Sequence, residues 1–484
     1  MKKKKISSLL KEIFSFEFCC SLIFMIVTYV MVMKHELWFD EVQAWALAKN
    51  LNVIELISQM KIEGHSAMWS LFLKIFVQCG FNVVVLNFIS WFIGVLSTIL
   101  ICYKTNFNKL IKVLIVFNVS LLYFSTVFAR PYCIAFLMMV LLMIFYKDRY
   151  SKPYFIGLIL LILSNTHLMV MGFLFAMFLM ELYGLFKDKD YVKERIILML
   201  FMVVGVLLFF FQIIGAFGAR ESMFNGVTLG EMFYQFSETI LYFFGALFHW
   251  SLLSFLGVVF IILLTKELFK YKKYFLIFII SVLFYLLLAS FYLLNSYKSF
   301  FIISVIIFCI SEIHRKYEDK KIFIYFMLLM LCSLPNSIYA FKEEYTKVVS
   351  DSMNVWDRID NRYDSNILTM SSIMGFSIYC DNCTFVNYYG GIEYKYNIFD
   401  TYGLVIFDKS KFYDLLIEYD IDYVVLYGGE AELLEEDLND LEDNLNIIKK
   451  EYSTDMKIGV SKKLSLFEPY TLYKVNKEYL EYEK

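Results

Sequence analysis

Two adjacent carboxylates follow directly on the first hydrophobic run of the chain and are the residues best placed to do chemistry. Asp40 and Glu41 lie in the segment His35–Trp45, which also carries two tryptophans. Tryptophan favours the boundary between lipid and water, because its ring is largely apolar but carries one hydrogen-bonding group. The segment therefore predicts a polar site at a membrane surface, where a lipid-borne substrate could meet a water-borne one.

A structural role for Asp40 fits the same residues. Asp40 precedes the apolar run Val42–Leu47. Gln43 stands three residues after Asp40, which is the spacing of a capping box at a helix start. The two roles are compatible, since a carboxylate that caps a helix is held rigidly and can still face a cavity.

Three further polar residues stand on the same predicted loop as Asp40. Glu63 and His65 could converge with Asp40 and Glu41, although a lone histidine in a loop is more often structural. Lys61 is a possible cation for an anionic substrate. Asp, Glu and His are also metal ligands, so a divalent cation stays open as a cofactor. The spacing matches no metal-binding motif, and the sequence names neither a metal site nor any other cofactor.

Several bases and one histidine lie at the ends of later hydrophobic runs. Arg130, Arg220 and Lys298 are placed to bind an anionic head group, since arginine suits phosphate geometry, but each could equally anchor its segment at the lipid surface. His167 closes the polar segment Ser164–His167 between two apolar runs. Polar groups at membrane depth face a cavity or another helix and are functional candidates.

One cysteine pair stands apart from the other seven cysteines. Cys380 and Cys383 form a C-x-x-C pair, and the strand-like residues Thr384–Val386 follow it. A thioredoxin-like redox site would place the pair at the start of a helix. We therefore expect a structural disulfide or two free thiols rather than redox catalysis.

The elements that must position these residues are mostly membrane spans. The chain is 60% hydrophobic, with a mean hydropathy of +0.61, whereas soluble domains are about 45–50% apolar. This composition predicts a polytopic membrane protein. Eleven runs are candidate spans: 14–34, 81–102, 109–128, 131–146, 153–166, 167–186, 196–216, 240–264, 274–293, 297–313 and 321–340.

The loops between these runs predict the sidedness. Alternate loops are basic, for example Lys2–Lys5, Lys147–Lys152 and Lys266–Lys273, whereas most loops of the opposite set carry a single base. The positive-inside rule then places the N-terminus in the cytoplasm of a multi-pass cell-membrane protein. With an odd number of spans, the C-terminal tail lies outside.

The chain divides into a membrane domain, 1–340, and a soluble tail, 341–484. The first outer loop of the membrane domain, 35–80, contains the amphipathic stretches Val42–Leu51, Val53–Met60 and Ala67–Val77. These stretches are better suited to lying along the membrane surface than to spanning the membrane. The tail holds 28 Asp and Glu against 15 Lys and Arg, which argues against nucleic acid as a partner.

The tail also changes period, from long apolar runs to alternating strand and helix patterns, which predict a small α/β domain. Strand patterns occur at 366–370, 403–407 and 422–427, and helix patterns at 411–419 and 430–445.

The order of these motifs resembles a known family. A basic cytoplasmic start and one span precede Trp38–Glu41, then Gly64-His65, Ala129–Tyr132 and Asn165–His167. This order resembles the GT-C superfamily of integral membrane glycosyltransferases, in the branch of protein O-mannosyltransferases and lipid A aminoarabinose transferases. The likeness covers roughly residues 14–340. It implies a mainly α helical bundle of GT-C type that moves a sugar from a polyprenyl-phosphate donor to an extracytoplasmic glycan, lipid or protein.

The resemblance also implies roles for single residues. Asp40 would be the catalytic general base, and Glu41 would support it or contact the acceptor. His65 matches a histidine that the family normally follows with proline, whereas Ser66 follows it here. Arg130 and Tyr132 match an Arg-x-Tyr-like stretch, and we extrapolate from this match to a role near the donor phosphate. One base acting in a single displacement would invert the sugar carbon.

Two other classes of function fit a membrane protein of this kind. A carrier could flip a lipid-linked sugar without making a bond. Carriers usually show paired halves or spans broken by Gly or Pro, whereas this chain has only four prolines and no visible internal symmetry, which speaks against a carrier. A non-catalytic scaffold could instead bind a partner through the acidic segment Glu430–Leu445. Only the enzyme requires the carboxylate of Asp40.

Overall fold

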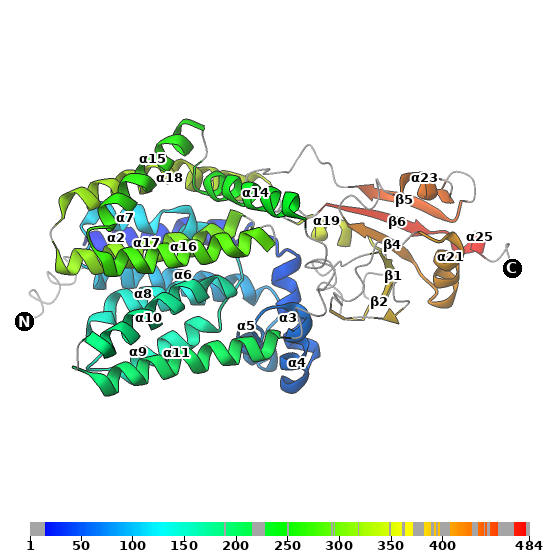
Figure 1. The fold of residues 1–484 in the computed structure, drawn as a ribbon. Helices are drawn as coiled ribbons and strands as arrows, with labels where there is room; N and C mark the ends of the chain where they lie inside the picture. The colour runs from blue at the N-terminus through cyan, green and yellow to red at the C-terminus, as the bar shows by residue number, and fades with distance from the viewer. Residues whose placement is uncertain are drawn as a thin grey trace, which may run out of the picture.

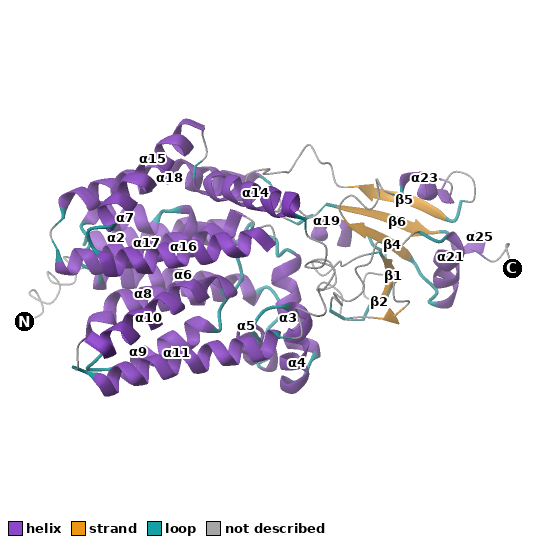
Figure 2. Ribbon diagram, viewed as in Figure 1, coloured by secondary structure: helices purple, strands orange, loops and turns teal. Residues whose placement is uncertain are grey.

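A long helical body with a small sheet domain at one end makes up the protein (Figure 1). The computed structural model describes residues 15–187, 190–214, 228–248, 251–291, 294, 296–317, 319–347, 350–360, 364–370, 382–388, 392–393, 395–396, 407–427, 434–439, 441–442, 446–453 and 469–480. The described chain is mainly helical, and its strands lie together in a single sheet (Figure 2).

The helical body is built from helices that run along its length. They are α2 (Phe16–Val32), α6 (Val85–Lys104), α7 (Lys109–Val116) with the π-helical η1 (Ser120–Phe124), α8 (Tyr132–Phe145), α9 (Pro153–Ser164), α10 (Met171–Lys187), α11 (Val192–Ile213), α14 (Leu229–Leu247), α15 (Ser251–Leu268), α16 (Lys272–Phe291), α17 (Ser299–Lys316) and α18 (Lys320–Thr346).

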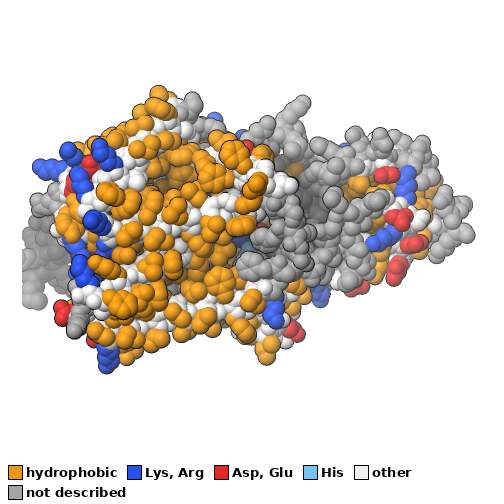
Figure 3. All heavy atoms as spheres, in the orientation of Figure 1, with side chains coloured by type: hydrophobic (Ala, Val, Ile, Leu, Met, Phe, Trp, Pro, Cys, Tyr) orange, Lys and Arg blue, Asp and Glu red, His pale blue; other side chains and the backbone are white. Residues whose placement is uncertain are grey.

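Five helical segments of the described chain are long and apolar enough to cross a membrane: Val85–Lys104, Leu168–Lys187, Val192–Ile213, Lys272–Phe291 and Lys320–Thr346. Many of their apolar side chains face outward, since only 28% of the apolar window of Val192–Ile213 is buried inside the protein. Soluble proteins rarely expose such continuous apolar surface. Figure 3 shows hydrophobic side chains over most of the visible face of the helical body, with Lys and Arg gathered mainly at the end away from the sheet domain. The protein is therefore a helical membrane protein.

The predicted span 240–264 is wrong, because two helices meet inside it. Helix α14 ends at Leu247, and α15 begins at Ser251. Phe248 between them is extended and buried, and its ring lies so close to Gly257 that a β-carbon there would clash with it. The helix α14 therefore ends at a buried aromatic residue.

The start of α14 also lies before the predicted run. A capping box forms there, because Glu231 accepts from the Thr228 N–H at 2.7 Å and donates its own N–H to the Thr228 hydroxyl at 3.2 Å. At the end of the helical body, α18 continues to Thr346, so the domain boundary predicted at residue 340 falls inside a continuous helix.

Three short helices lie between the helical body and the sheet domain (Figure 1). They are α3 (Phe39–Asn50), α4 (Val53–Glu63) and α5 (Met68–Gln78), and they fall on the three stretches marked in the first loop. The Asn52 side chain caps α4, and Gly64 ends it in a left-handed conformation (φ +72°) that glycine adopts at little cost.

The sheet domain contains six strands in the order β3-β2-β1-β4-β6-β5. Their bounds are β1 (Asn366–Thr369), β2 (Thr384–Asn387), β3 (Ile392–Glu393), β4 (Tyr423–Tyr427), β5 (Ile448–Ser453) and β6 (Tyr470–Val475). Strand β1 is parallel to β2 and β4, and the remaining pairs are antiparallel.

The predictions for the tail hold where they can be compared. The strands expected at 366–370 and 422–427 are β1 and β4, and the helix expected at 411–419 is α21 (Lys409–Glu418). Residues 403–406 of the third expected strand lie outside the described residues. Within the expected helix 430–445, the described part contains the short α23 (Glu435–Asn439). The strands β5 and β6 were not predicted.

The two faces of the sheet pack against different partners. Alternate strand residues such as Leu368 and Val424 share a core with Leu416 of α21. Residues of the opposite face share a core with Trp45 and Trp69 of α3 and α5; they are Ile367, Phe385, Tyr423, Val425, Tyr470 and Leu472. The C-terminal domain therefore packs directly on the helices of the first outer loop.

Candidate active site

The start of α3 gives its two acids different surroundings. The helix is capped at Trp38, two residues earlier than predicted, and Glu41 is the acid that accepts the Trp38 N–H, at 3.0 Å. The prediction that Asp40 and Gln43 form the capping box is therefore wrong. Because Glu41 reaches back to the cap, Asp40 stands in the first turn with its side chain available for another partner.

Asp40 pairs with an arginine from a distant loop. Its Oδ2 lies 3.0 Å from a terminal nitrogen of Arg130, which also donates to the Asp40 backbone carbonyl at 2.8 Å. The Asp40 side chain keeps 25% of its surface exposed, against 7% for Arg130. Burial alone would lower the pKa of Arg130, but Asp40, Tyr132 and Tyr297 together outweigh burial and raise that pKa above its ordinary value.

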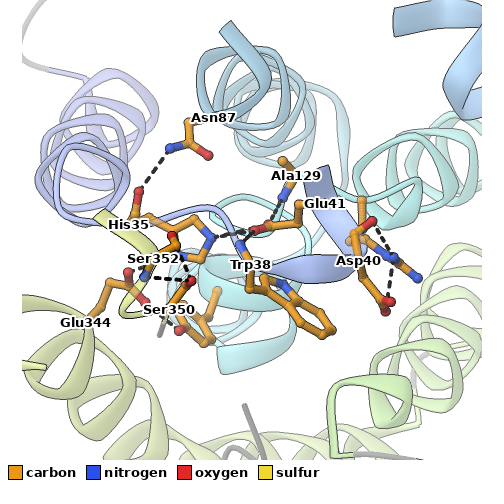
Figure 4. Close-up of polar contacts among 11 residues, drawn as sticks. His35, Trp38, Asp40, Glu41, Asn87, Ala129, Glu344, Ser350 and Ser352 are labelled. Atoms are coloured by element: carbon orange, nitrogen blue, oxygen red, sulfur yellow. Dashed lines mark hydrogen bonds and ion pairs between the residues drawn. The ribbon is translucent and has the colours of Figure 1, made fainter. Parts of the chain in front are cut away.

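Glu41 is fully buried and holds two loops together. Besides Trp38, its carboxylate accepts the Ala129 N–H at 2.6 Å and lies 3.0 Å from Nε2 of His35. The other ring nitrogen of His35 lies 2.9 Å from Glu344. Figure 4 shows Glu41 turned toward His35 and Ala129, with Asp40 pointing away from them. This position fits a supporting role for Glu41 rather than contact with an acceptor.

Asp40 lies on the wall of a small pocket of about 40 Å³. One face of α3 forms part of the wall, with the helical spacing i, i+3, i+4 and i+7 at Asp40, Gln43, Ala44 and Leu47. The other lining residues are Met60, Glu63, His65, Ser66, Trp69, Ser70, Arg130, Pro131, Thr166 and His167. The pocket thus joins the short helices α3, α4 and α5 to two loops of the helical body.

The candidates of the first loop reach this pocket in part. Glu63 is buried in its wall and accepts from the amide of Gln43 at 2.8 Å. His65 lines the pocket as an exposed side chain. Lys61 is also exposed but does not line this pocket. Three of the four residues expected to converge, Asp40, Glu63 and His65, therefore share this wall, whereas the fourth, Glu41, does not line it.

The candidates of the later loops gather around His167. The Met169 N–H donates to His167 Nδ1 at 3.1 Å, so the other ring nitrogen carries the proton of a neutral ring. Tyr132 is completely buried, and its ring packs against His167 with the centroids 5.6 Å apart. Lys298 and Arg130 both lie within electrostatic range of His167. Arg220 lies outside the described residues.

The described residues include no group of three or more His, Cys, Asp or Glu arranged to hold a metal ion. In the sheet domain, Cys383 is disulfide-bonded, and Cys380 lies outside the described residues.

Two important residues escaped the sequence reasoning. His35 and Glu344 are 309 positions apart, and no motif connects them. A histidine directly after the first span and an acid directly after the last one are the signals that could have suggested the pair.

Compared with known proteins, the chain matches no protein-family model and no curated protein sequence. The chemistry of the site is therefore the basis for assigning a function.

Proposed function

We propose that this protein is an integral membrane glycosyltransferase that moves a sugar from a polyprenyl-phosphate donor to an acceptor hydroxyl outside the membrane. One observation carries the proposal. Asp40 is a partly exposed carboxylate on the wall of a pocket, and a buried guanidinium holds it in place. A carboxylate fixed in this way can accept a proton from a bound hydroxyl group.

In the proposed reaction, Asp40 takes the proton of the acceptor hydroxyl as its oxygen attacks the anomeric carbon. The bond from that carbon to the phosphate oxygen breaks, and the polyprenyl phosphate leaves with the bonding electrons. Arg130, Lys298 and His167 are grouped so that they can stabilise the negative phosphate. A phosphate is already a good leaving group, so a single base is sufficient, and the single displacement inverts the sugar carbon.

The arrangement of the helices supports a site on the outer side. We count α14 and α15 as one interrupted span, so that the described helices of the body would make eleven passages. The bases gather mainly at the end away from the sheet domain, which the positive-inside rule assigns to the cytoplasm (Figure 3). The pocket, the interfacial helices and the sheet domain then lie on the outer side, as in a GT-C-type enzyme.

A carrier for lipid-linked sugars is the second candidate, and the break between α14 and α15 favours it. Interrupted spans are typical of carriers, because the freed backbone groups can bind a substrate. A carrier makes no covalent bond, so it has no need for a base at residue 40. The same experiment therefore separates the two functions.

The test compares cell-envelope polymers, lipids and proteins by mass spectrometry in cells that lack the chain, carry it, or carry Asp40→Asn at the same protein level. We expect one sugar modification to depend on the chain and to fall at least about a hundredfold in Asp40→Asn, since general-base catalysis is typically worth about 10²–10⁴. Asp40→Asn also removes the ionic partner of Arg130 and should lower the free energy of unfolding by about 1–3 kcal/mol. This value lies between those of exposed and buried ion pairs.

The matched control is Asp408→Asn, because Asp408 only caps α21 and asparagine caps equally well. This variant should retain the modification in full. Normal modification in Asp40→Asn cells would refute the enzyme and leave the carrier as the better assignment.

A further inference from the structure

A buried chain of charged groups connects the candidate active site to the helix that leads into the C-terminal domain. We propose that His35, at the centre of this chain, is a positioning residue that holds Asp40 opposite Arg130. The inference rests on the proposed catalytic role of Asp40.

The first link is the carboxylate of Glu41, which collects three donors. Two of them are backbone N–H groups, from Trp38 at 3.0 Å and from Ala129 at 2.6 Å. Trp38 lies two residues before Asp40, and Ala129 lies directly before Arg130. One carboxylate therefore fixes both chain segments that carry the Asp40–Arg130 pair.

The second link is His35, which lies between two acids. Its Nε2 lies 3.0 Å from Glu41 and its Nδ1 lies 2.9 Å from Glu344, and the side chains of all three residues are at most 1% exposed. A neutral imidazole has one N–H, so only the protonated ring can donate to both carboxylates. The Asn87 amide holds the His35 carbonyl at 3.1 Å and fixes the position of the loop (Figure 4).

The groups around His35 favour its protonated form. Burial alone would lower the pKa of His35, but the charges and hydrogen bonds of Glu41 and Glu344 raise it well above its ordinary value. Glu36 on the same loop adds a further acid, and the Phe128 ring stacks on the imidazole at a centroid distance of 5.8 Å. The two carboxylates therefore favour the charged form of the ring, which in turn attracts both of them.

The third link is Glu344, near the C-terminal end of α18. Its second oxygen accepts the hydroxyl hydrogen of Tyr123. A few residues beyond, α19 (Ser352–Trp356) places Val355 and Trp356 in the core that the sheet shares with α3 and α5. The position of the catalytic pair thus depends on where α18 and the C-terminal domain are docked.

The experiment measures the distance between residues 40 and 130 without relying on activity. Cysteines replace both residues (Asp40→Cys with Arg130→Cys), and a short bis-methanethiosulfonate reagent cross-links them in the full-length protein in detergent. Mass spectrometry of peptides quantifies the cross-link. Adding His35→Gln should lower its yield at least about fivefold, whereas the protein still elutes as a single folded species.

The matched control is His314→Gln. His314 is also a histidine packed on aromatic rings, Phe107 and Phe323, but it lies elsewhere, with its ring bonded to the Asn106 carbonyl. It should leave the cross-link unchanged. If His35→Gln does not yield folded protein, Glu344→Gln is the milder variant, because it leaves the ring with Glu41, and it should lower the yield in the same direction.

An unchanged cross-link in the folded variant would overturn the positioning role. The proposed function is tested separately on protein without these cysteines. If His35→Gln lowers the cross-link but Asp40→Asn leaves the envelope sugar intact, the structural link holds and the enzyme assignment fails. If Asp40→Asn abolishes the sugar and His35→Gln leaves the cross-link intact, only the positioning inference fails.

Discussion

Replacing Glu41 with glutamine should destabilise the whole protein, although the neighbouring acid is the proposed base. Glu41 is fully buried and accepts from Trp38, Ala129 and His35. Glutamine has the same shape, but its NH₂ group must face one of these donors, and it removes the charge that His35 requires. The variant therefore tests whether the two adjacent acids have different roles.

The size of the effect follows from these contacts. A hydrogen bond to a charged group contributes about 1.5–3 kcal/mol, and removing one partner of a buried ion pair costs about 3–5 kcal/mol. Glutamine keeps one acceptor oxygen, so the losses do not add in full. We expect Glu41→Gln to lower the free energy of unfolding by about 3–5 kcal/mol.

The assay is unfolding of the detergent-solubilised protein by a denaturing detergent, followed by tryptophan fluorescence. Glu55→Gln is the matched control, because Glu55 accepts the N–H of the capping residue Asn52 at 2.9 Å in the same way, but at the exposed start of α4. It should cost less than about 1 kcal/mol. Equal losses in the two variants would refute the buried ion network.

Two more predictions concern other parts of the structure. Burial raises the pKa of Glu36 from 4.5 to about 7, so the folded state binds this proton more tightly than the unfolded state does. The resulting contribution to the free energy of unfolding is fully present below pH 4.5 and is lost as the pH rises through about 7. Thermal melts of Glu36→Gln should accordingly show higher stability than the parent at pH 8 and little difference at pH 5; a variant with the parent's pH profile would contradict this. In the helical body, a β-carbon at Gly205 would lie 3.2 Å from the Cα of Leu161 and would clash with the Ser164 hydroxyl. Gly205→Val should therefore cost roughly 1–3 kcal/mol and lower the yield of folded protein on size exclusion, whereas Gly230→Val, at a position with room, should not.

The interfacial helices were well predicted because their signals are local. Alternation of polar and apolar residues places α3, α4 and α5 within a few residues of the expected stretches. The span predicted at 240–264 was wrong as a continuous helix, because the signal used for it is an average over many residues. Hydropathy averages over a window and cannot detect that one apolar helix ends at Leu247 and the next begins at Ser251.

The sequence predicted which acids belong to the candidate site, but it did not predict which of them caps the helix. The Asp-Glu pair and the later arginine, Arg130, were found from residue type and position. The spacing favoured Asp40 as the capping acid, and the structure gives that task to Glu41, because only Glu41 has donors from two other segments within reach. His35 belongs to no motif, and its partner Glu344 lies 309 residues further along the chain.

The sequence by itself determined that this is a helical membrane protein with amphipathic helices after its first hydrophobic run and a small α/β tail. These properties depend on composition and on periods within short windows, which the chain carries locally. The tertiary structure decided which acid is buried and which faces the pocket, and it brought His35, Ala129 and Glu344 together around Glu41. Such contacts depend on how distant helices pack, and no local pattern encodes them.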